Sequence, residues 1–329
     1  MILTRAPLRI SLGGGGTDLP SYYSRHGGFI LSAAIDKYVY IALNRPSADD
    51  LIRLKYARSE EVCTPDELEH DLVRPSLKLL GIDRRVEIAS MADVPAGTGL
   101  GSSSTYLVAL LTALHELKRE RMYAPQLAEL AFHVEAELAG HPVGKQDHYL
   151  AALGGLTCLE IDRDGTVACS TLELPSGVIE DLASHTLLFN TGISRSANAI
   201  LEQQKRDSTA SKRTVIESLH RTKEIGLQVK DALMRGDLAA FGHILHEHWE
   251  NKKRRSSGIS VGDVDRWYDT ARDAGALGGK LVGAGGGGFL MLYCHNGTKQ
   301  DVREALRPAG LREMEYRFDH EGAKVLVNF

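Results

Sequence analysis

The segment "VPAGTGLGSSSTYLVALL", from Val94 to Leu111, limits what this chain can fold into more than any other stretch. Gly97, Gly99 and Gly101 alternate with other residues, and three serines follow them directly. Leucines then recur at three- and four-residue steps, which predicts the apolar face of a helix over Ser102–Glu120. Serine favours the N-cap position, so we expect one of these serines to cap that helix.

The backbone before this helix is suited to binding an anion. The first turn of a helix has unpaired N–H groups and the positive end of the helix dipole. Glycines lack a Cβ atom, so an anion can approach the main chain closely. A phosphate site is therefore one interpretation of the segment. The other is a tight strand-to-helix connection with a serine cap.

The usual phosphate-binding motifs do not fit elsewhere in the chain. "GHPVGKQ" and "GALGGKL" approach the Walker A pattern, but both have the wrong glycine spacing and no hydroxyl after the lysine. The pattern G-x-G-x-x-G occurs at Gly283, Gly285 and Gly288, where the apolar run that follows predicts a strand. The dinucleotide fingerprint requires a helix at that point. Only a helix there would revive a nucleotide-dependent oxidoreductase as an alternative.

Composition sets the outer limits. The chain has 329 residues, enough for two domains, and a net charge of −4, which argues against a general nucleic-acid binder. Its four cysteines are widely spaced and are expected to be reduced thiols of a cytosolic protein. The N-terminal residues do not resemble a signal peptide, and no apolar run reaches membrane-spanning length. We therefore expect a cytoplasmic location and neither a nucleic-acid nor a membrane partner.

The order of strand-like and helical patterns predicts an α+β fold. Strand-like runs dominate up to about Leu188, apart from predicted helices over Ser102–Glu120 and Pro125–Gly140. The pattern is mostly helical from Ser196 to about Gly275, and short strands return at the end. This is not a regular βαβ alternation. We expect two closely packed domains, residues 1–188 and 189–329, with a ligand site in the cleft between them.

Two further segments suggest chemistry. "APLRISLGGGGTDLPSYY" places Arg9 on a predicted strand before four glycines and Asp18, although a hairpin turn with a solvated aspartate fits the same pattern. "VEAELAGHPVGKQDHYLAALGG" carries Glu135 on a predicted helix and Asp147 in a loop. Asp147 is suited to act as a base or to contact a substrate hydroxyl, and it is equally suited to cap a helix.

Three motifs in order give the chain a resemblance to the GHMP kinase superfamily, which includes galactokinase, homoserine kinase, mevalonate kinase and phosphomevalonate kinase. They are "APLRISLGGGGTDLP", the segment Pro95 to Ser104, and "GAGGGGFL". The first departs from galactokinase, which has Gly-Glu-His-Thr-Asp where this chain has Gly-Gly-Gly-Thr-Asp. "GGGGTDLPSYY", "VGKQD" and "TGISRSA" resemble the sugar-kinase branch that acts on D-glycero-D-manno-heptose 7-phosphate.

The resemblance implies a two-domain GHMP kinase fold that uses ATP and Mg²⁺. Ser103 and Glu135 match the positions that hold Mg²⁺. Asp147 matches the catalytic aspartate, and Arg9 matches the basic residue that keeps it ionised and stabilises charge on the phosphoryl group. The residues implied for the ATP phosphates are Pro95, Gly97, Gly99, Leu100, Gly101, Ser102, Ser103 and Ser104.

The resemblance also implies a small-molecule partner, a sugar phosphate converted to a 1,7-bisphosphate for surface polysaccharide, and it allows a homodimer. The alternatives are a kinase for fucose, galactose or mannose, and a non-catalytic sugar-phosphate binder on the same fold. Candidates for the cation that binds the distal phosphate are Arg195, Lys145 and Arg25, each of which also fits a surface charge. Expected substrate contacts from the main motifs are Thr17, Asp18, Gly285 and Gly286.

Two features of the predicted helix near residue 250 invite other readings. His243, His246 and His248 do not match H-E-x-x-H, so we expect no metal site there. The basic run Lys252 to Arg255 falls at the predicted end of the helix, where cations complement the dipole. We therefore expect that run to be solvated.

Overall fold

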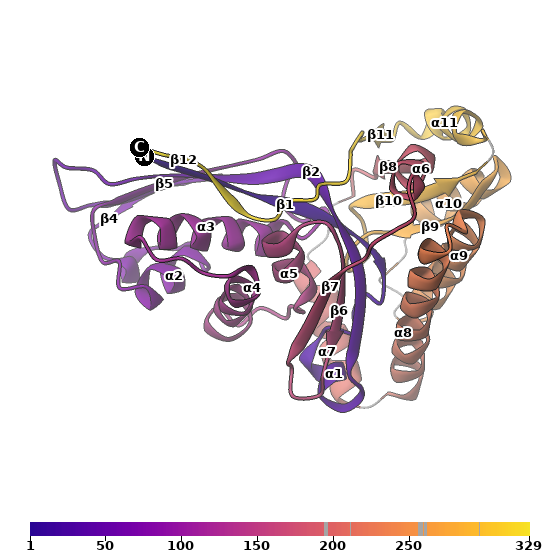
Figure 1. Cartoon of the computed structure of the whole chain (residues 1–329), viewed down its shortest axis with the longest axis horizontal. Helices are drawn as coiled ribbons and strands as arrows, with labels where there is room; N and C mark the ends of the chain where they lie inside the picture. Colours follow the sequence, from indigo (N-terminus) through magenta and orange to yellow (C-terminus); the bar gives the residue numbers. More distant parts are fainter. Residues whose placement is uncertain (194–196, 211, 256–258, 260–261, 296) are drawn as a thin grey trace.

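The computed structural model describes residues 1–193, 197–210, 212–255, 259, 262–295 and 297–329. Two sheets organise these residues, one built mainly from the N-terminal half and the other from the C-terminal half (Figure 1). Their strands are antiparallel except for the pair β3 (Ile52–Lys55) and β5 (Val86–Ala92). The α+β expectation is confirmed.

The first sheet has the order β12-β1-β2-β5-β3-β4, and β6 and β7 extend it from another part of β2. β2 (Gly28–Asn44) is one long strand, and it pairs with β1 (Ile2–Gly13), β5 and β6 (Leu156–Ile161). Its length lets one sheet support both the helical layer and the site. The remaining strands are β4 (Ser59–Val62), β7 (Val167–Thr171) and β12 (Lys324–Asn328).

Helices cover one face of this sheet, with α3 (Ser102–Lys118) along its middle (Figure 1). The predicted apolar face of α3 is buried, since Leu107, Leu110 and Leu114 are inaccessible to solvent. The helix expected over Pro125–Gly140 changes after Phe132 into a π-helix, His133–Leu138. The other helices of this half are α1 (Pro20–His26), α2 (Val73–Leu79), α4 (Ala124–Phe132) and α5 (Gln146–Leu153).

The second sheet has the order β11-β8-β10-β9, with all pairs antiparallel. A strand, β10, follows the glycines at 285–288, so the dinucleotide fingerprint is excluded. The strands are β8 (Thr186–Asn190), β9 (Ala276–Leu281), β10 (Phe289–Cys294) and β11 (Arg312–Glu313). The helices are α6 (Val178–His185), α7 (Ala197–Thr209), α8 (Arg213–Met234), α9 (Leu238–Lys253), α10 (Gly262–Asp273) and α11 (Lys299–Leu306).

A shared apolar core joins the two halves. Leu8 and Ile10 of β1 belong to the same buried cluster as Ile225 of α8 and Phe289 of β10. The expected division at Leu188 falls inside β8, which belongs to the second sheet, and β12 returns to the first sheet. None of the described helices is long and apolar enough to cross a membrane.

The turn after β1 depends on a glycine that has no room for a side chain. Gly14 has a φ of +81°, and a Cβ atom there would lie 1.8 Å from the Phe29 carbonyl oxygen. Gly81 has a φ of +66° but no atom within 4 Å of a built Cβ, so it serves as a matched control. We expect Gly81→Ala to cost about 1–2 kcal/mol from backbone strain alone. Gly14→Ala should cost more than about 3 kcal/mol, since strain and overlap add.

Urea unfolding of both variants measures these losses. Equal losses would contradict the tight contact between the turn and β2.

Candidate active site

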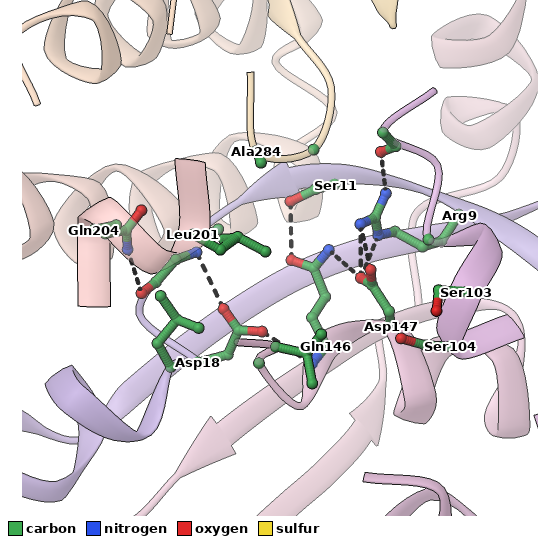
Figure 2. Close-up of a pocket in the computed structure, with 18 of the residues that line it drawn as sticks. Arg9, Ser11, Asp18, Ser103, Ser104, Gln146, Asp147, Leu201, Gln204 and Ala284 are labelled. Atoms are coloured by element: carbon green, nitrogen blue, oxygen red, sulfur yellow. Dashed lines mark hydrogen bonds and ion pairs between the residues drawn. The ribbon is translucent and has the colours of Figure 1, made fainter. Parts of the chain in front are cut away.

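A pocket lined by several charged side chains lies between the two sheets (Figure 2). Its first wall comes from β1, the loop after β1, the glycine-serine loop and the start of α5, and its second wall comes from α7, the end of α9 and the loop after β9. The residues that carry charge or a polar side chain there include Arg9, Ser11, Asp18, Ser103, Glu135, Gln146, Asp147, Gln204, Lys252 and Arg255.

The glycine-serine loop forms one end of the pocket. The residues from this loop that line it are Gly97, Gly99, Gly101, Ser102, Ser103 and Ser104. The expected serine cap is wrong, because Gly101 is the N-cap of α3, with φ 82° and ψ 21°. A Cβ atom at Gly101 would lie 3.1 Å from the Asp147 carboxylate. The unsubstituted backbone thus brings the helix N-terminus against that acid.

Arg9 and Asp147 form a two-pronged ion pair in the pocket (Figure 2). Arg9 Nε donates to Oδ1 of Asp147 at 2.7 Å, and Nη2 donates to Oδ2 at 2.8 Å. The third contact of the guanidinium is from Nη1 to the Gly99 carbonyl, at 2.6 Å. Arg9 is buried on β1, while the Asp147 side chain, on the first turn of α5, keeps 24% of its surface exposed. The arginine therefore fixes the acid beside the loop and leaves it accessible.

Glu135 lies buried on the π-helix behind the serines. Its carboxylate accepts hydrogen bonds from Ser103 Oγ at 2.6 Å, Ser104 Oγ at 2.7 Å and His148 Nε2 at 2.7 Å. Burial opposes ionisation, but hydrogen bonds from His141 and His148 outweigh it and hold the pKa of Glu135 well below its usual range. Glu135 is thus an ionised oxygen donor at the pocket wall.

Asp18 lines the pocket, whereas its neighbour Thr17 does not. Asp18 lines the pocket and accepts from the main-chain N–H groups of Gly16 and Gln146, at 3.1 and 3.0 Å. Burial, followed by the nearby charge of Asp147, raises the pKa of Asp18, opposed by those N–H bonds. Thr17 is fully buried, and its hydroxyl contacts the Gly14 and Phe29 main chain. Thr17 therefore holds the turn instead of contacting a substrate.

Two of the three cations expected to bind a distal phosphate, Lys145 and Arg25, do not line the pocket. Lys145 is buried against Glu129, with Nζ 2.6 Å from Oε1, and it also donates to the Gly165 carbonyl. Its charge is already compensated, so Lys145 is corrected to a structural role. Arg25 is an exposed residue of α1 and does not line the pocket. Arg195 lies outside the described residues.

Four other residues expected to contact a ligand do not line the pocket. The loop after β9 lines the pocket with Gly283 and Ala284, whereas Gly285 and Gly286 pack against Ile259. Leu100 is fully buried in the core between the halves. Pro95 is an exposed residue outside the pocket. These four residues shape the loops and do not line the site.

Sequence reasoning missed two buried charges of the pocket. Lys252 and Arg255 line the pocket and are 7% and 6% exposed, so the solvated helix end expected for this run is wrong for both. Arg254, between them, is exposed as expected. The signal was spacing, because Leu245 and Trp249, both fully buried, precede Lys252 by seven and three residues. Lys252 thus continues the buried face of α9.

The N- and C-terminal models of the GHMP kinase family match residues 71–155 and 229–311. The D-glycero-alpha-D-manno-heptose 7-phosphate kinase of Campylobacter jejuni is 30% identical, over 98% of both chains. The chain belongs to the GHMP kinase family. This GHMP kinase is accordingly a phosphotransferase.

Solved structures agree with that assignment. A D-glycero-D-manno-heptose 1-phosphate kinase from Bacteroides thetaiotaomicron superposes with a TM-score of 0.83 at 28% identity, with 100% of both chains covered. The galactokinase of Lactococcus lactis, at 20% identity and a TM-score of 0.76 over 98% of this chain and 94% of its own, shares the fold. The expected GHMP kinase fold is confirmed.

The ion pair between Arg9 and Asp147 should show strong energetic coupling. Removing one partner leaves a buried or half-buried charge unpaired, which costs about 3–5 kcal/mol in buried pairs. We expect a double-mutant cycle with Arg9→Met and Asp147→Asn to give a coupling of at least about 1.5 kcal/mol.

Urea unfolding without nucleotide measures that cycle. The exposed pair Arg213–Glu217, at 2.7 Å, is the control and should couple by less than about 1 kcal/mol. Additive losses at Arg9 and Asp147 would show that the pair does not form as described.

Proposed function

We propose that this GHMP sugar kinase transfers the γ-phosphoryl group of ATP to the anomeric hydroxyl of D-glycero-D-manno-heptose 7-phosphate. The product is the 1,7-bisphosphate, a precursor of nucleotide-activated heptose for surface polysaccharide. The observation that carries the proposal is the Arg9–Asp147 pair held against the N-terminus of α3. The names of two similar proteins support a phosphorylated manno-heptose and differ in the position of its phosphate. We favour the 7-phosphate, because transfer to C1 requires a free anomeric hydroxyl.

The residues of the pocket suit phosphoryl transfer. The ATP phosphates bind the main-chain N–H groups of the glycine-serine loop and the first turn of α3. Asp147 accepts the proton of the sugar hydroxyl while the oxygen of that hydroxyl forms a bond to the γ-phosphorus. The bond from that phosphorus to the bridging oxygen breaks, and ADP leaves. An anomeric hydroxyl is more acidic than an ordinary alcohol, which suits a carboxylate base.

Arg9 has two tasks in this scheme. Its bidentate contact fixes the orientation of Asp147, and its positive charge lies beside the glycine loop where negative charge develops. Phosphoryl transfer depends mainly on positioning and on charge stabilisation. One buried guanidinium supplies both.

Ser103 and Glu135 fit a Mg²⁺ ion that accompanies the nucleotide. The exposed hydroxyl of Ser103 and the ionised carboxylate of Glu135 are hard oxygen donors at the pocket wall. Mg²⁺ commonly takes one or two such groups and completes its shell with phosphate and water. In the described part of the chain, no group of three or more His, Cys, Asp or Glu side chains is arranged to hold a metal alone. A bound ion would neutralise phosphate charge.

The sugar would lie between Asp147 and Asp18. Asp18 is held by two main-chain N–H groups, and it presents its carboxyl group to the pocket, where it can hydrogen-bond a sugar hydroxyl. A Cβ atom at Gly144 would lie 2.1 Å from Asp18 Oδ2, so Gly144 makes room for this placement.

One alternative is a kinase for an unphosphorylated sugar. It is favoured by the similarity to an L-fucokinase/L-fucose-1-P guanylyltransferase of Bacteroides fragilis, 27% identical over 88% of this chain and 34% of that protein. A non-catalytic binder would not need the Arg9–Asp147 pair.

Asp147→Asn tests the proposed base. An amide accepts no proton and carries no charge, so kcat should fall by about 10²–10⁴-fold while ATP binding changes little. A coupled ADP-release assay with heptose 7-phosphate measures turnover. Asp83→Asn, an exposed acid outside the pocket, is the control and should keep wild-type rates. Turnover within twofold of wild type in Asp147→Asn would remove this residue from the mechanism.

The same assay separates the sugar candidates when it is run with heptose 7-phosphate, the free heptose, mannose, galactose and fucose. Heptose 7-phosphate should exceed the others in kcat/KM by at least about tenfold, or roughly 1.4 kcal/mol. A better unphosphorylated sugar would leave the kinase in place and reject the heptose phosphate.

Ser103→Ala and Glu135→Gln test the metal assignment. Each removes an oxygen donor, so the Mg²⁺ concentration for half-maximal rate should rise several-fold. Glu137→Gln removes an exposed carboxylate of the same π-helix and should leave the titration unchanged. Unchanged titrations in both test variants would place the metal elsewhere.

A further inference from the structure

The end of α9 and the residues directly after it bring two buried cations, Lys252 and Arg255, into the pocket. Lys252 Nζ donates to the carbonyls of Leu281 and Gly283, at 3.0 and 2.6 Å. Within the described part of the chain, neither Lys252 nor Arg255 contacts a carboxylate. All of their partners there are neutral oxygens.

Arg255 is held in place by three side chains. Nε donates to Ser218 Oγ at 3.4 Å, Nη1 to Gln204 Oε1 at 3.3 Å, and Nη2 to Thr222 Oγ1 at 2.6 Å. Among the described residues, these bonds leave one N–H group on each terminal nitrogen without a partner, because a guanidinium has five N–H donors. The fork geometry of those donors matches the oxygens of a phosphate.

The arrangement is costly until an anion arrives. Burial lowers the pKa of Lys252 to about 7, helped by the charges of Arg255 and Arg9, and burial lowers the pKa of Arg255 to about 10. Buried cations are normally paired, since desolvation without compensation is expensive. Here the pocket supplies the opening through which a compensating anion could reach them.

The two cations serve different parts of the pocket. In Figure 2, Arg9, Asp147 and Ser103 lie at one end, and Gln204 and Asp18 lie at the other. Arg255 bonds Gln204, and its Nη1 would lie 2.8 Å from a Cβ atom at Gly16, which places it at the Gln204 end.

Lys252, in contrast, donates to the Gly283 carbonyl in the loop that meets the glycine-serine loop. It is close enough to Arg9 for the charge of Arg9 to lower the pKa of Lys252. Lys252 therefore belongs to the end where a phosphoryl group would be transferred. Arg255 remains for an anion at the far end of the acceptor.

We propose that Arg255, oriented by Gln204, Ser218 and Thr222, binds the phosphate group that the acceptor sugar already carries. This rests on the proposed function and assigns the part of the site that recognises a phosphorylated substrate. A sugar whose anomeric hydroxyl lies at Asp147 extends its opposite end past Asp18 toward Arg255. A free sugar leaves the guanidinium uncompensated.

Paired substrates test the assignment. Wild type, Arg255→Met and Arg255→Lys are assayed with heptose 7-phosphate against heptose and with mannose 6-phosphate against mannose. Arg255→Met should lower the preference in kcat/KM for the phosphorylated member of each pair at least 30-fold, because the free sugars carry no phosphate for Arg255 to bind. Arg255→Lys keeps the charge without the fork and should give an intermediate preference. The exposed neighbour variant Arg254→Gln should match wild type.

A stability measurement shows that the variant still folds. Arg255→Met removes an uncompensated buried charge, so its melting temperature without ligand should equal or exceed that of wild type. Heptose 7-phosphate should raise the melting temperature of wild type and not that of Arg255→Met.

Failure of this inference is distinct from failure of the proposed function. If wild type phosphorylates no sugar, the kinase proposal fails. Calorimetry of sugar binding without ATP then tests whether Arg255 binds the phosphate. A binding preference for heptose 7-phosphate over heptose that is lost in Arg255→Met supports it. The inference is overturned if Arg255→Met keeps the full preference, if wild type has none, or if Arg195→Ala abolishes it while Arg255→Met does not.

Discussion

The site depends on a close contact between two loops from different sheets. A Cβ atom at Gly99 would lie 2.4 Å from the Val282 carbonyl, and one at Gly283 would lie 2.5 Å from the Gly99 carbonyl. Side chains at either position would therefore force the sheets apart. Arg9 donates to the Gly99 carbonyl and Lys252 to the Gly283 carbonyl, so a cation from each half is fixed to this contact. The contact thus sets where both charges stand relative to the helix N-terminus.

The electrostatics of the pocket follow from this geometry. Its cations are oriented before any ligand binds, because carbonyl, hydroxyl and amide oxygens hold them in place. Such preorganisation avoids reorganisation when charge develops during a reaction. The unligated protein carries the cost of holding Lys252 and Arg255 out of water. A bound polyanion would offset that cost, so the folded protein would be more stable with such a ligand than without it.

The sequence alone was informative where a motif is local. The glycine-serine loop, the helix after it and the strand after Gly288 follow from short-range propensity and periodicity, and the structure contains all three. The structure also brings Arg9 and Asp147 together, although 138 residues separate them. That pairing was available from the resemblance to a family and not from local pattern.

Other features depended on tertiary packing that local sequence does not encode. Lys145 looked like a free loop cation, but Glu129 on α4, 16 residues earlier in the chain, compensates its charge. Thr17 looked like a polar contact, but the β1 turn uses its hydroxyl internally. Lys252 and Arg255 looked solvated because runs of basic residues usually are. The burial of Lys252 follows from which face of α9 meets β9, and Arg255, just beyond the helix, is buried against α7 and α8. Residue type does not reveal either arrangement.

The pairing of β12 with β1 has a consequence for the order in which the molecule is assembled. β12 is made after every strand of the second sheet, yet it completes the first sheet, with Ile2 opposite Asn328 (Figure 1). During synthesis β1 therefore has one unpaired edge while the whole C-terminal half emerges. An open edge strand is a template for pairing with other chains. The nascent protein is exposed to misassembly along β1 until its last strand closes that edge.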